Sequence, residues 1–379
     1  MILCVLSSYG GGVAPQCGVV RTQSGEEDLM GKRRRLPDEL GIFGVLLLVA
    51  AIMTLLSPEF MTLGNIQVLM LNGTVVAFLA LGQTFVLLTG GIDLSVGSNI
   101  ALTGMMAALA MRAGASWWLA ALIALGAGLV VGLINGAIIH LVKLPPFIVT
   151  FSTFGIAASI PKILTGAQSI TVADPMFAVI GRGSLYGVPI PVILLAIFAA
   201  IFIVVLKQTP AGVHIYAVGG NPDASRLAGV NIGRQILTVY AISGLCAGMG
   251  GIITTSRLMV GYPTAGSGNE QFYSIASAVV GGVSLFGGVG SIVGALLGAI
   301  LIATVSNGMN VVGVDSFWQP LVIGVIILVG VSLDAVRRRF TLKEAIGRLL
   351  KSDGTRPSSA APPPPESHPQ PESVPGTTK

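Results

Sequence analysis

Few residues of this chain have the chemistry of a reactive or ion-binding site, and most of these lie inside apolar segments. The clearest case is Asp93, which follows Gly90 and Gly91 in the stretch VLLTGGIDLSVGSNIALTG, residues 86–104. A carboxylate there suits the N-cap of the helix that follows, beside unpaired backbone N–H groups. The second interpretation is a direct role in a transport path or at a partner face. The sequence leaves both interpretations open.

Motifs of hydrolysis and of metal binding are missing from the sequence. It contains no phosphate loop of the form G-x-x-x-x-G-K-[ST], no H-E-x-x-H and no G-x-S-x-G. The three histidines lie far apart, and Cys4, Cys17 and Cys246 have no metal-ligand spacing. We therefore expect no enzyme, no bound cofactor and no metal, and no ATP hydrolysis by this chain itself.

Uncharged polar side chains are the other useful groups in the apolar segments. Ion-coupled carriers usually hold several ionisable residues within their spans, whereas these segments are nearly free of charge. Amides and hydroxyls can line a path for a neutral, polyhydroxylated solute, and they can equally bond one helix to the next. The candidates for a translocation path are Asn72, Gln83, Asp93, Ser95, Asn99, Asn135 and Asn307.

The composition is that of an integral membrane protein. Of the 379 residues, 53% are hydrophobic and only 10% are charged, whereas a soluble domain has about 25% charged residues. The net charge of +5 comes from Lys and Arg in short runs beside apolar segments. Such runs orient membrane proteins, so we expect membrane lipid and no nucleic acid among the partners.

Apolar runs of about 20 residues predict an all-α, polytopic membrane protein. Nine runs have this length: 41–57, 66–89, 93–112, 116–140, 145–165, 188–206, 234–256, 291–312 and 317–336. A tenth apolar segment, 272–286, is too short to cross simply and is broken by Gly281 and Gly282. It is either a half-helix or part of a longer kinked span. Counting it gives about ten transmembrane segments, some broken by glycines.

Basic runs flank the apolar region at both ends. KRRR stands at 32–35, before the first apolar run, and RRRFTLKEAIGRLLK stands at 337–351, after the last. The excess of Lys and Arg in cytoplasmic segments predicts that both termini are cytoplasmic, which requires an even number of crossings. N-terminal sequencing would show whether translation begins at Met1 or at Met30.

Three parts follow from this organisation. Residues 1–35 form a disordered, basic N-terminal tail, and residues 36–340 form the transmembrane domain. Residues 341–379 form a cytoplasmic tail that is Pro-rich and disordered from about 352, because it has too few large apolar residues to fold.

The basic loop at about 207–233 contains signals for a short cytoplasmic helix. Asn221 suits an N-cap, Pro222 the first helical position, Arg226 the negative helix end and Gly229 the terminating position. They predict about two helical turns at the membrane surface. Such a helix suits docking on a cytoplasmic partner, or it is an ordinary loop helix.

Glycines recur at four-residue spacing in several apolar runs. This spacing places them on one helical face, where two backbones can approach closely, either within one subunit or between subunits. The glycines are Gly128, Gly132 and Gly136, Gly244 and Gly248, and Gly290, Gly294 and Gly298.

Three stretches of the sequence resemble permease subunits of bacterial ABC importers for monosaccharides, the ribose, xylose and galactose group. They are GQTFVLLTGGIDLSVGS (82–98), IYAVGGNPDASRLAGVNI (215–232) and GGVSLFGGVGSIVGALLGAILI (281–302), in the order that the family has. The resemblance runs from roughly 41 to 336. It implies a permease domain in the bacterial cytoplasmic membrane that translocates a xylose- or ribose-like monosaccharide.

The resemblance also implies partners. These are a second copy of the chain in a homodimer, an ABC ATP-binding subunit that binds and hydrolyses the ATP, and an extracytoplasmic sugar-binding protein. In the family, the loop that matches 219–229 contacts the ATPase. The resemblance assigns this ATPase contact to the matching residues of this chain, which are Gly220, Asn221, Pro222, Ala224, Arg226, Leu227 and Gly229. NEQFYSIASAVVGG, around the start of the third stretch, departs from the ribose-type pattern, and GVDSFWQ (313–319) is closer to xylose-type members.

Other functions remain open. One is a self-sufficient secondary carrier or facilitator of small polar solutes, and another is an ABC permease for a nucleoside or other non-sugar solute. The stretches GGIDLSVGS and GGVSLFGGVGS also look alike, as if two halves of the chain shared a broken-helix element. An offset of six helices would make the repeat parallel, and an offset of five would make it inverted.

Overall fold

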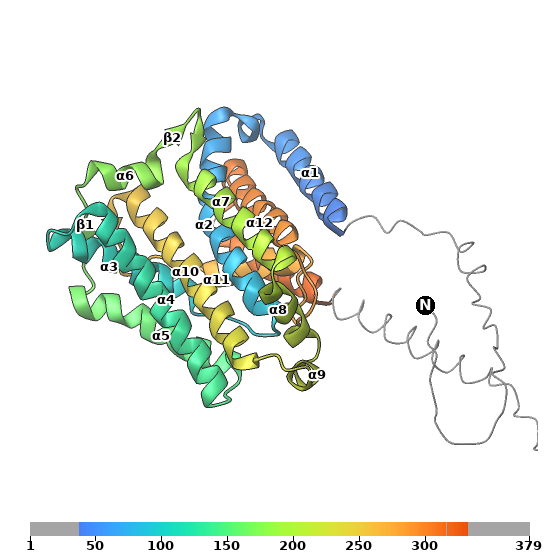
Figure 1. Ribbon diagram of the computed structural model, residues 1–379. Helices are drawn as coiled ribbons and strands as arrows, with labels where there is room; N and C mark the ends of the chain where they lie inside the picture. The colour runs from blue at the N-terminus through green and yellow to red at the C-terminus, as the bar shows by residue number, and fades with distance from the viewer. Residues whose placement is uncertain (1–37, 316, 333–379) are drawn as a thin grey trace, which may run out of the picture. The chain divides into compact units, whose positions relative to one another are not determined.

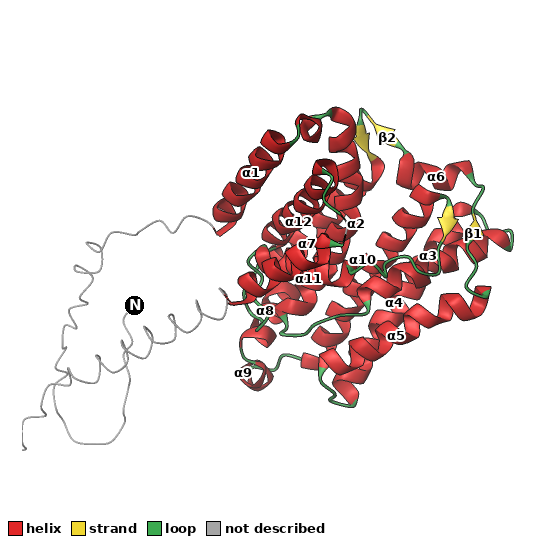
Figure 2. Cartoon of the chain, turned by 180° about the vertical axis from the view of Figure 1, so that it is seen from behind, coloured by secondary structure: helices red, strands yellow, loops and turns green. Residues whose placement is uncertain are grey.

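The structure, a computed structural model, describes residues 38–315 and 317–332, and over this range the chain is a bundle of α-helices (Figure 1, Figure 2). Seven of the described helices are long and apolar enough to cross a membrane. They are α1 (Asp38–Leu56), α2 (Leu63–Leu88), α4 (Trp117–Leu141), α5 (Pro146–Thr165), α7 (Ile190–Gln208), α10 (Ile232–Leu258) and α12 (Ile292–Val312). The polytopic helical fold is confirmed to this extent, and the total of ten crossings stays a prediction.

The other three predicted segments contain shorter helices in the described range. α3 (Val96–Arg112) has 17 residues, α11 (Glu270–Val280) has 11, and an unlabelled helix covers Trp318–Ser332. At 1.5 Å per residue, α11 reaches only about half of the way across a hydrocarbon core of about 30 Å. Of the two interpretations of 272–286, the half-helix is therefore correct. The helix ends at Val280 because the next two residues are glycines, the second with φ 86°.

Short elements mark the two ends of the bundle. One end, the η1 end, carries η1 (Pro58–Met61), α6 (Pro175–Arg182) and two small antiparallel sheets (Figure 1). The sheets pair β1 (Ile170–Thr171) with β4 (Val260–Gly261), and β2 (Ser184–Leu185) with β3 (Val188–Pro189). The other end, the α9 end, carries α8 (Pro210–Gly220) and α9 (Pro222–Leu227). α2 starts beside η1 and runs toward α8, so Leu88 lies at the α9 end.

Several predictions fall on residues outside the described ranges. These are the N-terminal tail 1–35, with the choice of start at Met1 or Met30, and the C-terminal tail 341–379. The basic runs that predict cytoplasmic termini lie there too, so the placing of the termini stays a prediction.

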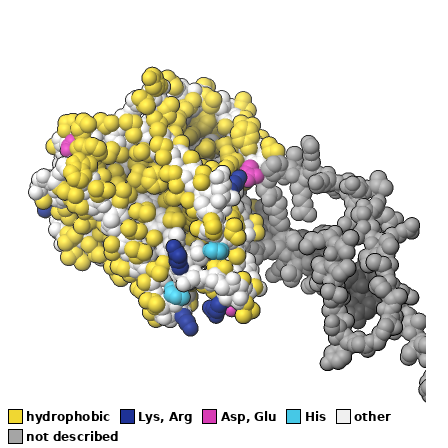
Figure 3. Space-filling view, in the orientation of Figure 1, with side chains coloured by type: hydrophobic (Ala, Val, Ile, Leu, Met, Phe, Trp, Pro, Cys, Tyr) yellow, Lys and Arg dark blue, Asp and Glu magenta, His cyan; other side chains and the backbone are white. Residues whose placement is uncertain are grey.

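The outer surface of the bundle is apolar. Figure 3 shows hydrophobic side chains over most of the visible face, with Lys, Arg and His side chains gathered at its lower edge, where Figure 1 places α9. Leu55 is 86% exposed and Ile163 is 77% exposed. Large apolar side chains at such exposure suit contact with lipid rather than water.

Glycine faces explain the closest helix contacts. A Cβ added at Gly128 would overlap the carbonyl oxygen of Gly244, and one at Gly132 would overlap that of Tyr240, so α4 and α10 touch backbone to backbone. A Cβ at Gly294 would likewise overlap the carbonyl oxygen of Gly281 at the end of α11. The four-residue spacing therefore packs helices within one subunit, as small residues do in membrane bundles. The prediction is wrong for Gly290, which lies in the turn before α12 and so shares no helical face with Gly294 and Gly298.

Candidate functional site

The three stretches that carry the family resemblance meet at the α9 end of the bundle. Two of them contain turns, the first link (residues 89–95, between α2 and α3) and the second link (residues 281–291, between α11 and α12). The backbone N–H of Gly288 in the second link donates to the carbonyl of Leu88 at 2.9 Å. Segments about 200 residues apart in the sequence are thus joined by one hydrogen bond.

The end of α8 is wedged against both links. A Cβ added at Gly219 would overlap the carbonyl oxygen of Leu88 and would lie 2.6 Å from the nitrogen of Gly288. Only a glycine fits there, because the neighbours are backbone atoms that cannot rotate away. We call this contact of Leu88, Gly219 and Gly288 the three-way junction. It connects α8 directly to both broken-helix elements.

Left-handed glycines shape the links around this junction. Gly90 has φ 77°, Gly287 φ 85° and Gly288 φ 76°, a region that residues with a Cβ rarely adopt. The hydroxyl of Tyr216, on α8, donates to the carbonyl of Gly290 at 2.8 Å and ties α8 to the second link once more. Burial raises the pKa of Tyr216 above its ordinary value of 10.0, so the phenol stays protonated and remains a donor.

α9 follows α8 after a single residue, and the helix predicted from its caps is confirmed. The side-chain oxygen of Asn221 accepts from the backbone N–H of Ala224 at 3.0 Å, and Pro222 occupies the first turn. Gly229, with φ 84°, lies beyond its C-terminus. Leu227 is 91% exposed, an unusual exposure for leucine, so α9 presents an apolar side chain outward. The role of these residues in contacting a partner stays a prediction.

Asp93 lies in the first link, where it is 1% exposed. One carboxylate oxygen accepts from the backbone N–H and the hydroxyl of Ser95, at 2.9 and 2.6 Å, and the other accepts from the hydroxyl of Ser243 on α10, at 2.8 Å. The prediction that Asp93 caps α3 is wrong, and the predicted start of the helix at 93 is three residues early. The carboxylate closes a turn onto the N–H two residues ahead, which leaves Ser95 as the N-cap residue.

Helices on all sides hold the first link. Asn135 of α4 donates from Nδ2 to the hydroxyl of Ser95 at 3.0 Å, and the hydroxyl of Thr150 of α5 donates to the carbonyl of Ile92 at 3.1 Å. In the amide orientation that satisfies both of its ends, Gln83 exchanges bonds of 3.1 and 3.2 Å with the backbone of Asp93. The structure therefore joins four of the path candidates, Gln83, Asp93, Ser95 and Asn135, in one buried polar network.

Two path candidates lie apart from this network. The side-chain oxygen of Asn72 accepts from Arg257 at the end of α10, at 2.6 Å. Asn307 of α12 exchanges hydrogen bonds of 2.9 and 3.1 Å with Asn65, beside η1. Both join helices near the η1 end, and a part in a solute path stays a prediction for them.

The start of α11 holds polar residues that were not among the candidates. Gln271 is 6% exposed and packs against Gly97 of α3, where an added Cβ would overlap its side-chain oxygen. Within the described part of the chain, this oxygen has no hydrogen-bond partner. The same is true of the side-chain oxygen of buried Asn99 and of Oε2 of Glu270. Buried polar atoms rarely go unpaired unless a water or a ligand serves them. The polar triplet NEQ before an interrupted apolar segment was the signal in the sequence.

Comparison with known proteins identifies the family of the chain. Residues 65–331 match a family described as the permease component of a branched-chain amino acid transport system. A probable ABC transporter permease protein of Sinorhizobium fredii is 40% identical over 318 residues, which cover 84% of this chain and 93% of the relative. A D-allose transport system permease protein of Escherichia coli is 38% identical over 299 residues, 78% of this chain and 91% of the relative.

A ribose import permease protein of Haemophilus influenzae is also 38% identical, over 297 residues that cover 77% of this chain and 91% of the relative. No solved structure matches the chain. The family match covers the links, α8 and α9 together, which are the parts that meet at the three-way junction. The chain therefore belongs to this family of transport-system permease components.

Proposed function

We propose that the chain is the membrane-spanning permease subunit of an ATP-driven importer for a monosaccharide of the ribose or xylose type, in the cytoplasmic membrane of a bacterium. Relatives named for ribose and D-allose transport support this, because they align over about nine-tenths of their own length. The chain works as a transport subunit, and ATP is bound and hydrolysed by a partner.

The buried side chains favour a sugar over a branched-chain amino acid, although the family description names the latter. An amino acid carries a carboxylate and an ammonium group, which need opposite charges or helix ends inside the membrane. Among the described residues, Asp93 is the only charged side chain that is fully buried, Glu270 at the start of α11 is partly buried, and the remaining buried polar groups are Ser, Thr, Asn and Gln. Hydroxyls and amides suit a neutral polyhydroxylated solute.

The three-way junction supports the proposal that ATP hydrolysis on the partner is coupled to movement of the links. The ATP-binding subunit docks on the exposed side of α9 at the cytoplasmic face, and the external binding protein delivers sugar to the η1 end. Movement of α9 passes through the single residue Asn221 to α8, whose Gly219 touches both links at once. Since a ligand shifts an equilibrium only by its differential affinity for two states, the ATPase must bind α9 differently before and after hydrolysis. A homodimer places two such junctions side by side.

The path runs beside the half-helix α11. Gln271 at the start of α11 packs against Gly97 at the start of α3, and Asn99 lies two residues farther along α3. The unpaired side-chain oxygens of Gln271 and Asn99 can each accept a hydrogen bond from a sugar hydroxyl. Asp93 acts as a positioning residue, because its two oxygens are already used by Ser95 and Ser243. A tilt of the links would carry Asn99 with α3 and so change access to the path.

Reconstitution in liposomes tests this function. The chain is combined with its ATP-binding subunit and binding protein, and uptake of labelled ribose, xylose, allose and leucine is measured with and without ATP. The proposal predicts uptake of one sugar that requires ATP and all three components. Sugar uptake by the chain alone without ATP would show a facilitator, and uptake of leucine instead of sugar would refute the proposed substrate class.

A further inference from the structure

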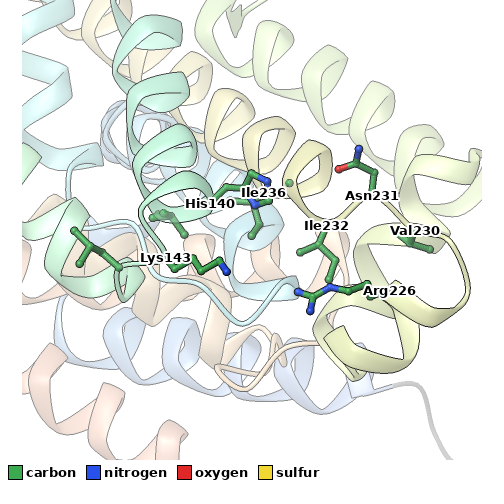
Figure 4. A pocket seen from close by; sticks show the side chains of 10 residues that line it. His140, Lys143, Arg226, Val230, Asn231, Ile232 and Ile236 are labelled. Atoms are coloured by element: carbon green, nitrogen blue, oxygen red, sulfur yellow. The ribbon is translucent and has the colours of Figure 1, made fainter.

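A pocket of about 420 Å³ opens at the α9 end, between the C-terminus of α4, helix α9 and the first turn of α10 (Figure 4). Three basic side chains line it, His140 of α4, Lys143 of the loop after α4, and Arg226 of α9. The lining residues, all within the described range, include no Asp or Glu. We call it the basic pocket. It is separate from the three-way junction and from the polar network around Asp93.

Among the described residues, no acidic side chain lines the pocket to offset the charges of Lys143 and Arg226. Figure 4 shows the side chains of Lys143 and Arg226 extending toward each other from opposite sides, with His140 deeper along α4. Two cations that approach across a pocket repel each other unless an anion lies between them. An anion there would accept charge-assisted hydrogen bonds from both side chains.

The backbone adds a further positive group to the basic pocket. α10 has 27 residues, and Ile232 and Gly233 of its first turn line the pocket. The side chain of Asn231 accepts from the N–H of Arg234 at 3.0 Å and so caps one of the first N–H groups of α10. The other N–H groups of the first turn have no partner within the helix, and the helix dipole makes this end positive, so it favours a phosphate or carboxylate. The ring of His140 packs closely against this turn, because a Cβ added at Gly233 would overlap it.

The surroundings place the basic pocket at the level of lipid headgroups. Leu141 is 75% exposed and Val142 is 60% exposed, and both directly precede Lys143 in the chain. α4 has 25 residues and is about 37 Å long, whereas the hydrocarbon core is about 30 Å thick, so its end reaches the headgroup layer. Exposed apolar side chains beside a lysine at that depth are typical of a boundary with lipid, where basic side chains reach phosphates.

We propose that the basic pocket binds the phosphate of an anionic phospholipid such as phosphatidylglycerol, held by Lys143, Arg226 and the first turn of α10. A phosphate carries the negative charge that neutralises these positive groups, and the acyl chains lie along the exposed apolar residues next to Lys143. A soluble phosphate or an acidic side chain of a protein partner would supply the charge but would leave that apolar rim uncovered. Because Arg226 belongs to α9, the bound lipid joins α9 to the end of α4. This inference does not depend on the solute that the chain transports.

Native mass spectrometry of the full-length chain in detergent, titrated with phosphatidylglycerol or phosphatidylcholine, tests the proposal. Wild type is expected to retain phosphatidylglycerol selectively, and Lys143→Gln is expected to bind it about tenfold more weakly, for loss of one charge-assisted hydrogen bond. Lys143→Arg is expected to keep the affinity. Lys162→Gln, the same change at an exposed lysine near the end of α5, is the matched control and is expected to bind as wild type. Thermal unfolding of each variant shows that it is folded.

Competition and docking experiments distinguish the other occupants. Glycerol 3-phosphate in excess is expected to leave the lipid bound, because it has no acyl chains, and its equal competition would overturn the proposal in favour of a soluble phosphate. The ATP-binding subunit is expected to bind the Lys143→Gln variant with unchanged affinity. If the variant instead fails to bind the ATP-binding subunit, and if that subunit releases the lipid from wild type, the pocket binds an acidic side chain of the partner and the lipid proposal is overturned. Equal lipid retention by wild type and Lys143→Gln would also refute it.

Discussion

Replacing Gly219 with alanine perturbs the three-way junction at its tightest point. The new methyl group would overlap the carbonyl oxygen of Leu88 and lie 2.6 Å from the nitrogen of Gly288. Carbon atoms in contact prefer separations of about 3.5–4.0 Å, so α8 must move away from the links by on the order of 1 Å. Both neighbours are backbone atoms, and no side-chain rotation can relieve the overlap.

We expect a loss of stability of the size usual for overpacking, together with a larger effect on coupling. Overpacking costs about 1–3 kcal/mol, and the better helix propensity of alanine offsets about 1 kcal/mol of this in α8. The shift of α8 separates the ATPase-driven element from the two links. We expect ATP-dependent sugar uptake to fall about tenfold, equal to about 1.4 kcal/mol of barrier. Hydrolysis of ATP by the complex should fall much less, so the number of sugars transported per ATP declines.

Gly220→Ala is the matched control, because it changes the neighbouring residue of the same helix in the same way. A Cβ added at Gly220 has no atom within 4 Å. Uptake and hydrolysis are measured for both variants in liposomes, and thermal unfolding in detergent is measured beside them. Equal transport by Gly219→Ala and Gly220→Ala would refute the reasoning. A decrease in transport by Gly219→Ala that is fully explained by a smaller amount of folded protein would refute it as well.

Four other substitutions, one of them with a matched control, test neighbouring parts of the structure. Tyr216→Phe removes the hydrogen bond to Gly290, worth about 0.5–1.5 kcal/mol, and should lower uptake per ATP several-fold in the liposome assay without changing docking of the ATPase. Asp93→Asn weakens bonds to Ser95 and Ser243, so the midpoint of thermal unfolding should fall while uptake per folded protein stays near wild type; lost transport at normal stability would show a direct role. Gly132→Ala overlaps the carbonyl of Tyr240 and should destabilise the bundle by about 1–3 kcal/mol in denaturation experiments. Gly126→Ala on the same helix has open space and should not. Gln271→Leu keeps the volume but removes the unpaired side-chain oxygen, so it should raise the KM for sugar in transport kinetics and leave unfolding unchanged.

Local signals in the sequence were sufficient to predict α9. Its N-cap, its proline and its terminal glycine act within a few residues of one another, and the structure contains a helix at Pro222–Leu227. The start of α3 was predicted less well. An aspartate before a helix can cap the helix, or it can close a turn by accepting from the N–H two residues ahead of it. Here the hydroxyl of Ser243, 150 residues away, bonds to the carboxylate of Asp93 and favours the turn. A contact at that distance along the chain is not visible in a local pattern.

In the candidate site, too, local features could be predicted from the sequence, whereas contacts between distant segments could not. Polarity within apolar runs was enough to select Gln83, Ser95 and Asn135, which the structure brings into one network. Gln271 was missed because its segment was judged by hydropathy, and its burial depends on Gly97 of another helix. The basic pocket was also beyond prediction, since His140 and Arg226 come from separate helices and become neighbours only when α4 packs on α10.

The position of the two links decides how the similar glycine-rich stretches are related. In an inverted repeat, equivalent turns lie at opposite faces of the membrane. Here Gly288 of the second link donates to Leu88, and the second link also approaches Gly90, so both turns lie at the α9 end. If the stretches are equivalent, their relation is parallel. One helix, α8, can then displace two equivalent turns in the same direction, and α3 and α12, which start from those turns, would tilt together in a single stroke of the ATPase.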